Sequence, residues 1–148
     1  SYYRATYTPS DGETYDSRFD GRFTLNAVYG KEWFKAAKNR TITASTRFLW
    51  LGGLNEQPVD VEASENQMQT VFDTSVGYVN QLKDYTRLDL RISFRKDKPG
   101  YTRTLAIDIQ NLFGIQNEAY HQYDFVTGQV ETRYQLGIIP MLVYRIDF

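Results

Sequence analysis

The chain has no cysteine, and only four prolines and ten glycines among its 148 residues. Without cysteine it can form neither a disulfide framework nor a thiolate metal site. It contains no run of roughly 18 apolar residues, so we expect no transmembrane helix. The net charge is −1, which gives no electrostatic reason to expect nucleic acid as a partner. These absences exclude several protein classes before any pattern is considered.

Chemistry-bearing residues are also scarce, because His121 is the only histidine. No pair of histidines can bind a metal, and the sequence alone assembles no Ser-His-Asp set. No glycine-rich phosphate loop of the required spacing occurs. The acidic residues Glu56, Asp60, Glu62 and Glu65 could supply oxygen ligands to Ca²⁺, but a solvated acidic loop is the simpler interpretation. We therefore expect no catalysis, no cofactor and no metal.

Aromatic residues are abundant instead, at 16% of the chain with 12 tyrosines and 9 phenylalanines, which favours strands over disorder. The mean hydropathy of −0.54 is typical of soluble proteins. Membrane β-strands can have the same low value, because alternate residues face a polar lumen. The first residues show no charged segment followed by an apolar one. We expect the chain to begin after a removed leader or as a fragment.

Alternation of apolar and polar residues with a period of two predicts an all-β, antiparallel protein. The last strand shows the pattern well, because Leu142, Tyr144, Ile146 and Phe148 share one face and Arg145 lies on the other. Six strands are expected, at residues 1–8, 21–34, 41–51, 86–95, 101–112 and 136–148. A short helix is expected near residues 61–72, and a small hairpin around residues 126–129.

The connections between these strands alternate in length. Residues 35–40 and 97–100 make short turns, whereas residues 52–84 and 113–135 make long loops. Strands of ~9–12 residues with short turns on one side and long loops on the other are typical of outer-membrane β-barrels. Lys31 and Arg103 occupy positions that alternation assigns to the apolar face. Both lie near the short turns, where a cation can reach lipid headgroups.

Six strands are too few for a membrane barrel, which needs ~8 strands to close. An open edge in lipid would leave unpaired backbone groups, each costing several kcal/mol. A membrane interpretation therefore requires other strands to complete the barrel. The alternative is a soluble antiparallel sheet with one wet face and one core face.

Three stretches, residues 85–94, 105–112 and 134–148, resemble the C-terminal end of TonB-dependent outer-membrane receptors, particularly those of Bacteroidetes. Residues 23–33 and 58–64 resemble the same family. The resemblance implies an up-and-down transmembrane barrel of ~22 strands in the bacterial outer membrane, of which this chain supplies the last six. It also implies uptake of a scarce ligand such as a siderophore, a cobalamin or an oligosaccharide. The partners would be the lipid bilayer, the rest of the barrel, a plug domain, TonB and the outer-membrane insertion machinery.

Three sets of residues are then candidates for function. The long loops would be extracellular, and their amphipathic aromatic and imidazole side chains would contact ligand: Tyr120, His121, Tyr123 and Tyr134. Polar residues of the strands would face the lumen: Arg87, Asp89, Arg91, Asp108 and Arg145. The resemblance implies that the end of the last strand is an assembly signal, carried by Tyr144, Ile146 and Phe148.

Two other functions remain open at this stage. A soluble, lipocalin-like barrel would place the apolar parity around a small-molecule pocket and the charged parity outside. An outer-membrane barrel enzyme or adhesin could be built on the same strands.

Overall fold

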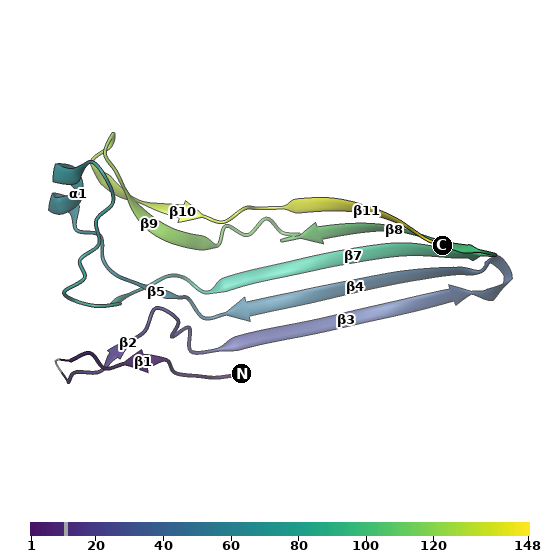
Figure 1. Cartoon of the computed structure of the whole chain (residues 1–148), viewed down its shortest axis with the longest axis horizontal. Helices are drawn as coiled ribbons and strands as arrows, with labels where there is room; N and C mark the ends of the chain where they lie inside the picture. The colour runs from purple at the N-terminus through teal and green to yellow at the C-terminus, as the bar shows by residue number, and fades with distance from the viewer. Residues whose placement is uncertain (11) are drawn as a thin grey trace. The chain divides into compact units, whose positions relative to one another are not determined.

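The computed structural model describes residues 1–10 and 12–148 and consists mainly of antiparallel strands (Figure 1). The chain divides into two compact units. We call residues 26–49, 86–115 and 136–148 the sheet unit, and residues 1–25, 50–85 and 116–135 the loop unit. No helix in the described part of the chain is long and apolar enough to cross a membrane.

A five-stranded sheet in the order β11-β8-β7-β4-β3 dominates the sheet unit. Its strands are β3 (Thr24–Lys35), β4 (Arg40–Leu51), β7 (Tyr85–Lys98), β8 (Tyr101–Gln110) and β11 (Ile139–Asp147). Each strand pairs with its neighbours in chain order among these five, so the sheet is a meander. The strands expected over residues 21–34, 41–51, 86–95, 101–112 and 136–148 are confirmed, with ends shifted by a few residues.

The first of the six expected strands, over residues 1–8, is not continuous. Within it only Thr6–Tyr7 forms a strand, β1, which pairs with β2 (Tyr15–Asp16), while Tyr2 makes an isolated antiparallel bridge with Phe23. Arg4 supplies one physical reason, because its guanidinium makes ion pairs with Asp16 and Asp20 at 2.8 and 3.0 Å. Local pairing thus competes with the long sheet. The sheet that the described residues form is open, with β3 and β11 at its edges.

The register places apolar side chains in rows that cross three strands. Ile107 pairs with Ile92 of β7 and Leu142 of β11, and Leu105 pairs with Phe94 and Tyr144 in the same way. The opposite face carries rows such as Arg91–Asp108–Met141 and Ser93–Ala106–Val143. We call these the apolar face and the polar face of the sheet.

Exposure on β8 is the reverse of what a soluble sheet would show. Leu105 and Ile107 on the apolar face are 40% and 44% exposed, whereas Ala106 on the polar face is 0% exposed. A water-soluble sheet normally buries the apolar face and leaves the polar one wet. The alternation predicted from the sequence is therefore present, and on β8 its apolar side is the more exposed one.

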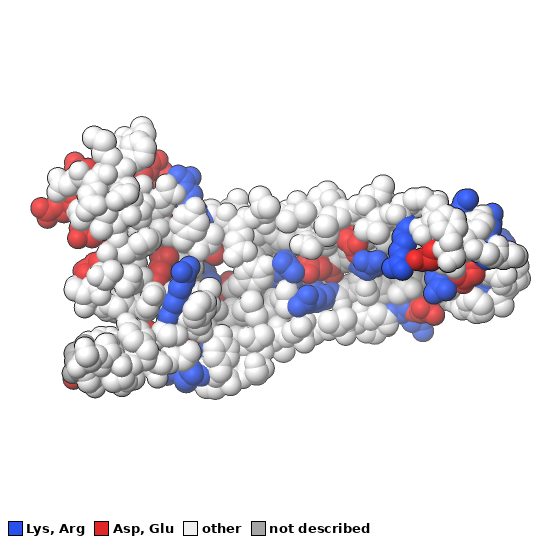
Figure 2. Space-filling view, viewed as in Figure 1, with Lys and Arg blue, Asp and Glu red and all other residues white. Residues whose placement is uncertain are grey.

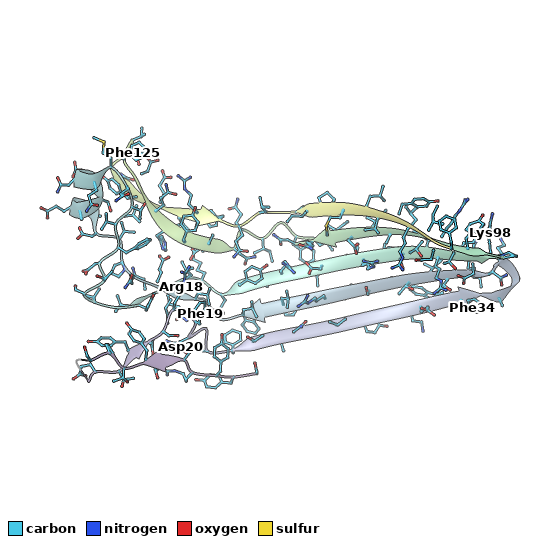
Figure 3. The ribbon with its side chains drawn as sticks, viewed as in Figure 1. Arg18, Phe19, Asp20, Phe34, Lys98 and Phe125 are labelled. Atoms are coloured by element: carbon cyan, nitrogen blue, oxygen red, sulfur yellow. The ribbon has the colours of Figure 1, made fainter. Side chains whose placement is uncertain are left out.

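Two short connections lie at one end of the sheet, which we call the short-turn end. The helix η1 (Ala36–Lys38) and Asn39 link β3 to β4, and Pro99–Gly100 link β7 to β8. Gly100 has φ 85°, a conformation that suits the third residue of a type II turn after proline. Phe34 and Lys98 both lie near this end (Figure 3).

The loop unit consists of short paired segments and one helix. β5 (Asn55–Glu56) pairs with β6 (Asn80–Gln81), and β9 (Glu118–Asp124) pairs with β10 (Gln129–Tyr134). The helix α1 (Val61–Gln67) begins at Asp60, whose carboxylate accepts a hydrogen bond from the Ala63 N–H at 2.9 Å, as an N-cap residue does. The helix and the small hairpin expected from the sequence are confirmed.

Glycine is required where β4 ends and the loop unit begins. A Cβ on Gly52 would lie 1.6 Å from the Gly21 carbonyl oxygen, and a Cβ on Gly53 would lie 1.7 Å from that of Leu82. Two backbone segments approach this closely only where no side chain intervenes. Trp50, just before them, donates its indole N–H to Asp84 at 3.0 Å, which holds the two ends of the long connection together.

Candidate functional site

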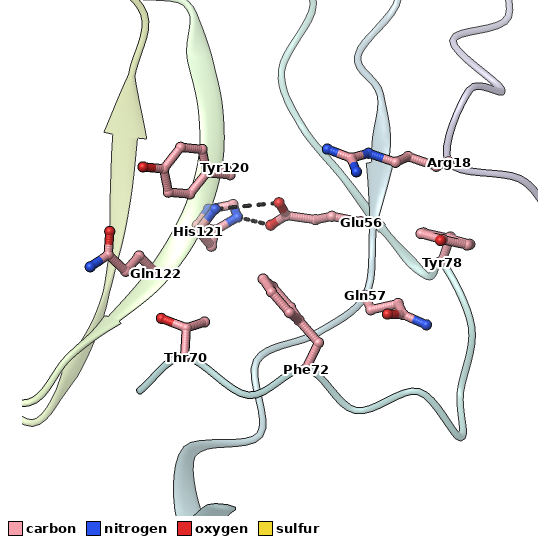
Figure 4. A pocket seen from close by; sticks show the side chains of 9 residues that line it. All are labelled: Arg18, Glu56, Gln57, Thr70, Phe72, Tyr78, Tyr120, His121 and Gln122. Atoms are coloured by element: carbon pink, nitrogen blue, oxygen red, sulfur yellow. Dashed lines mark hydrogen bonds and ion pairs between the residues drawn. The ribbon is translucent and has the colours of Figure 1, made fainter. Parts of the chain in front are cut away.

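A pocket of about 450 Å³ lies within the loop unit. Its residues come from β5, β9, the segment after α1 and the N-terminal part of the chain (Figure 4). They are Arg18, Glu56, Gln57, Thr70, Phe72, Tyr78, Tyr120, His121 and Gln122. The volume falls in the range of small-molecule sites, ~300–1,000 Å³.

Glu56 and His121 join two segments of the pocket that lie far apart in the sequence. The Glu56 carboxylate contacts His121 Nδ1 through Oε1, and its Oε2 accepts the His121 backbone N–H at 3.3 Å (Figure 4). The Glu56 side chain is only 12% exposed, so little water competes for it. The contact fixes β5 against β9 and sets the position of the imidazole in the pocket wall.

The remaining lining residues give the pocket a polar and aromatic character. Phe72, Tyr78 and Tyr120 offer ring faces, and Gln57, Thr70 and Gln122 offer amide and hydroxyl groups. Arg18 extends from its own segment toward the other lining residues (Figure 4). None of the ion pairs among the described residues involves its guanidinium. Such a set can stack on rings and hydrogen-bond to hydroxyl or carboxylate groups.

The four ligand-contact residues expected from the sequence separate into two groups. Tyr120 and His121 line the pocket, whereas Tyr123 and Tyr134 are not among its lining residues. Tyr123 is 4% exposed, and its backbone N–H donates to Thr70 Oγ1 at 3.1 Å, so it packs inside the loop unit.

Sequence reasoning did not identify the other side of the pocket. Arg18, Phe72 and Tyr78 come from irregular segments without a period, so no pattern brings them together. Glu56 was considered only as one of several acidic residues for Ca²⁺. In residues 1–10 and 12–148 no cluster of three His, Asp or Glu side chains could hold a metal ion. Glu56 contacts His121 and Asp60 caps α1 instead, so the geometry does not favour the Ca²⁺ interpretation.

The polar residues expected to face a lumen form ion pairs on the polar face of the sheet. Arg87 pairs with Asp89 and Arg91 with Asp108, both at 2.9 Å. Asp89 also accepts the Asn111 backbone N–H at 3.0 Å. Toward the short-turn end, Arg95 pairs with Asp97 at 2.9 Å and Arg145 with Asp147 at 2.6 Å. Half-buried charges therefore have partners, as burial requires.

A further ion pair fixes the base of the β9–β10 hairpin. Glu118 accepts the Lys83 backbone N–H at 2.9 Å and contacts the Lys83 ammonium at 2.8 Å. The hydrogen bonds from Lys83 hold the pKa of Glu118 below its usual value. The pair ties the end of the segment 52–84 to the start of β9.

The residues expected to signal assembly lie on and just beyond β11. Tyr144 belongs to the apolar row with Leu105 and Phe94, and Ile146 pairs with Arg103. Phe148 follows the last strand residue and is 100% exposed. Comparisons of this chain with protein-family models, with curated proteins and with solved structures found no match.

Proposed function

We propose that the chain is part of the wall of a transport barrel in the bacterial outer membrane, of the TonB-dependent kind. The observation that carries this proposal is the outward apolar face. Leu105, Ile107 and Leu142 lie in aligned rows at 40%, 44% and 72% exposure, a pattern that costs free energy in water and is stable against lipid.

The polar face supports the same interpretation. Arg91 and Arg95 are paired with Asp108 and Asp97, and Ala106, which lies between these pairs in the register, is fully covered. A barrel lumen that is partly filled by other protein parts would need this combination of neutralised charge and small residues. In the proposed receptor, a plug domain coupled to TonB supplies that filling.

The open edges of the sheet point to additional strands. β3 and β11 each have only one neighbour among the described strands. Every unpaired backbone group would cost several kcal/mol in the hydrocarbon region. We therefore infer that both edges pair with other strands of the same barrel.

The pocket of the loop unit is the proposed contact site for the imported ligand. Its aromatic faces, its amides and the Arg18 guanidinium suit a polar ligand with rings or carboxylates, as in an oligosaccharide or a siderophore. In the proposed orientation the short turns face the periplasm, and the long segments 52–84 and 113–135 are extracellular.

A labelling experiment tests the membrane assignment on neighbouring residues of β8. In the complete protein as its cells make it, Leu105→Cys and Thr104→Cys each receive an environment-sensitive fluorophore after insertion into phosphatidylcholine vesicles. We expect a lipid-borne quencher to act on the label at position 105 and aqueous iodide to act on the one at position 104, because alternate residues face opposite sides.

The soluble alternative predicts a different result. A protein that stays in the aqueous phase, with neither label accessible to the lipid quencher, would refute the membrane assignment and favour a lipocalin-like barrel. Quenching of both labels by the lipid-borne quencher would refute the assignment of neighbouring β8 residues to opposite faces.

A further inference from the structure

We propose that the sheet carries a site for the phosphate headgroup of an anionic phospholipid at its short-turn end. This inference rests on the proposed membrane location and adds a specific lipid partner to it. A pocket of about 390 Å³ lies there, within the sheet unit. Its lining residues are Lys35, Lys38, Arg40, Thr41, Ile42, Phe94, Arg95 and Lys96.

The pocket has an excess of positive charge. No acidic residue lines it. Arg95 pairs with Asp97 at 2.9 Å, but no ion pair among the described residues involves Lys35, Lys38, Arg40 or Lys96. On the face shown in Figure 2, several basic side chains lie toward this end of the sheet, with acidic ones among them. Like charges held together repel unless an anion lies among them.

Backbone pairing brings these cations together. The Asp97 N–H donates to the Asn39 carbonyl at 3.0 Å, which sets the end of β7 against the start of β4. Asn39 adopts φ 44° and ends the short turn, with Lys38 on one side of it and Arg40 on the other. The cluster is therefore fixed by the sheet and not by flexible loops.

The apolar part of the lining distinguishes a lipid from a free anion. Ile42 and Phe94 line the pocket together with the cations, and Phe94 belongs to the apolar row with Leu105 and is 46% exposed. A free phosphate ion gains nothing from such a surface. A phospholipid places its phosphate among cations and its acyl chain along apolar side chains, so both halves of the pocket would be used.

Two nearby cations offer a matched comparison because they already have a partner. Lys98 Nζ and Arg103 Cζ lie 5.5 and 5.0 Å from the centre of the Tyr101 ring, within the range of cation–π contacts. They lie at the same end of the sheet but do not line the pocket. Replacing Lys98 and Arg103 lowers the net charge of the protein by the same amount as replacing one lysine and one arginine of the pocket.

The test compares Arg40→Gln/Lys96→Gln with Lys98→Gln/Arg103→Gln in the complete protein. Each is inserted into phosphatidylcholine vesicles that contain a minority of phosphatidylglycerol. Retained lipid is then counted by native mass spectrometry after mild delipidation. We expect the pocket variant to retain about tenfold less phosphatidylglycerol than the unchanged protein. The comparison variant should lose much less of it. Lys35→Gln/Lys38→Gln, which changes two exposed residues at the end of β3 and in η1, should repeat the loss.

Four outcomes would overturn the proposal in different ways. Equal losses in both variants would show general attraction to a charged surface instead of a site. Release of phosphatidylglycerol by an excess of inorganic phosphate, with no effect of acyl length, would show a site for free anions. Failure of the unchanged protein to insert into pure phosphatidylcholine would refute the membrane location itself, whereas insertion without selective retention refutes the headgroup site alone.

Discussion

At the scale of single residues, the loop unit depends on Glu56 and Glu118, whose carboxylates each make two polar contacts. Both carboxylates hold segments that no regular strand pairing would join. Charge-assisted hydrogen bonds are stronger than neutral ones when they are shielded from water. Substitutions at these positions should therefore affect the order of the loops more than the sheet.

Glu56→Gln should loosen the β9 hairpin. The substitution removes the charge that faces His121, and we expect amide hydrogen exchange at His121 and its neighbours to accelerate by about tenfold, as for the loss of a charged hydrogen bond of ~1.5–3 kcal/mol. Glu62→Gln, in the exposed first turn of α1, is the matched control. Equal protection in both variants would contradict a structural role for Glu56.

The Lys83–Glu118 pair should make the base of the hairpin sensitive to acid. Because the pKa of Glu118 is lowered in the folded protein, its contribution is fully present above the usual glutamate pKa. It is lost as the pH falls through the lowered value. Hydrogen exchange at Lys83, corrected for its intrinsic pH dependence, should show reduced protection in that window. In Glu118→Gln that step should vanish, and its persistence would assign it to another carboxylate.

At the scale of elements, alternation was enough to predict the five sheet strands, the short helix and the small hairpin. It failed where local chemistry competes with a period of two. Residues 1–8 alternate, yet Arg4 and its aspartates hold them in a local hairpin. The strand expected to reach residue 112 ends at Gln110 because Asn111, at φ 53°, turns the chain and hydrogen-bonds to Ile115.

Only part of the pocket in the loop unit could be predicted from the sequence, because only part of its lining lies on a regular strand. Tyr120 and His121 lie on a strand in a loop already suspected of binding, so residue type alone singled them out. Arg18 and Phe72 approach the pocket through irregular backbone that carries no periodic signal. The basic pocket at the short-turn end was hinted at only by Lys31 and Arg103, neither of which lines it.

An added charge should lower the free energy of unfolding more on the apolar face of the sheet than on the polar face. An arginine at Ile107 would place a charge in the middle of the apolar face, and we expect a loss of ~2–4 kcal/mol in the free energy of unfolding from lipid vesicles. Leu90→Arg should behave in the same way. Ser93→Arg, on the polar face, should cost much less. Similar losses for Ile107→Arg and Ser93→Arg would contradict the assignment of faces.

Gly53→Ala should destabilise the junction between β4 and the loop unit. The added methyl group would meet the Leu82 carbonyl at 1.7 Å, so the backbone must shift, at a cost of ~1–3 kcal/mol. Gly137→Ala is the control, because a Cβ there meets no atom within 4 Å. Chemical denaturation of both variants in the same lipid gives the comparison. A neutral Gly53→Ala would contradict the close approach.

At the scale of the whole molecule, Phe148 offers a test of assembly. Deleting it removes the exposed aromatic after β11, which we expect the insertion machinery to recognise together with the strand. The amount inserted in cells should fall sharply, while refolding into liposomes stays nearly normal. If both fall together, Phe148 anchors the strand at the interface and is not a signal.

The meander order of the sheet also has a kinetic consequence. β7 and β8 are joined by Pro99–Gly100 alone, and β3 and β4 by one short turn, whereas the pairings β4–β7 and β8–β11 must wait for long connections to close. Loop closure costs more entropy as the connection lengthens. The two hairpins should therefore form early and independently, and the order in which they zip together, with β11 added along β8, sets the folding pathway of the sheet.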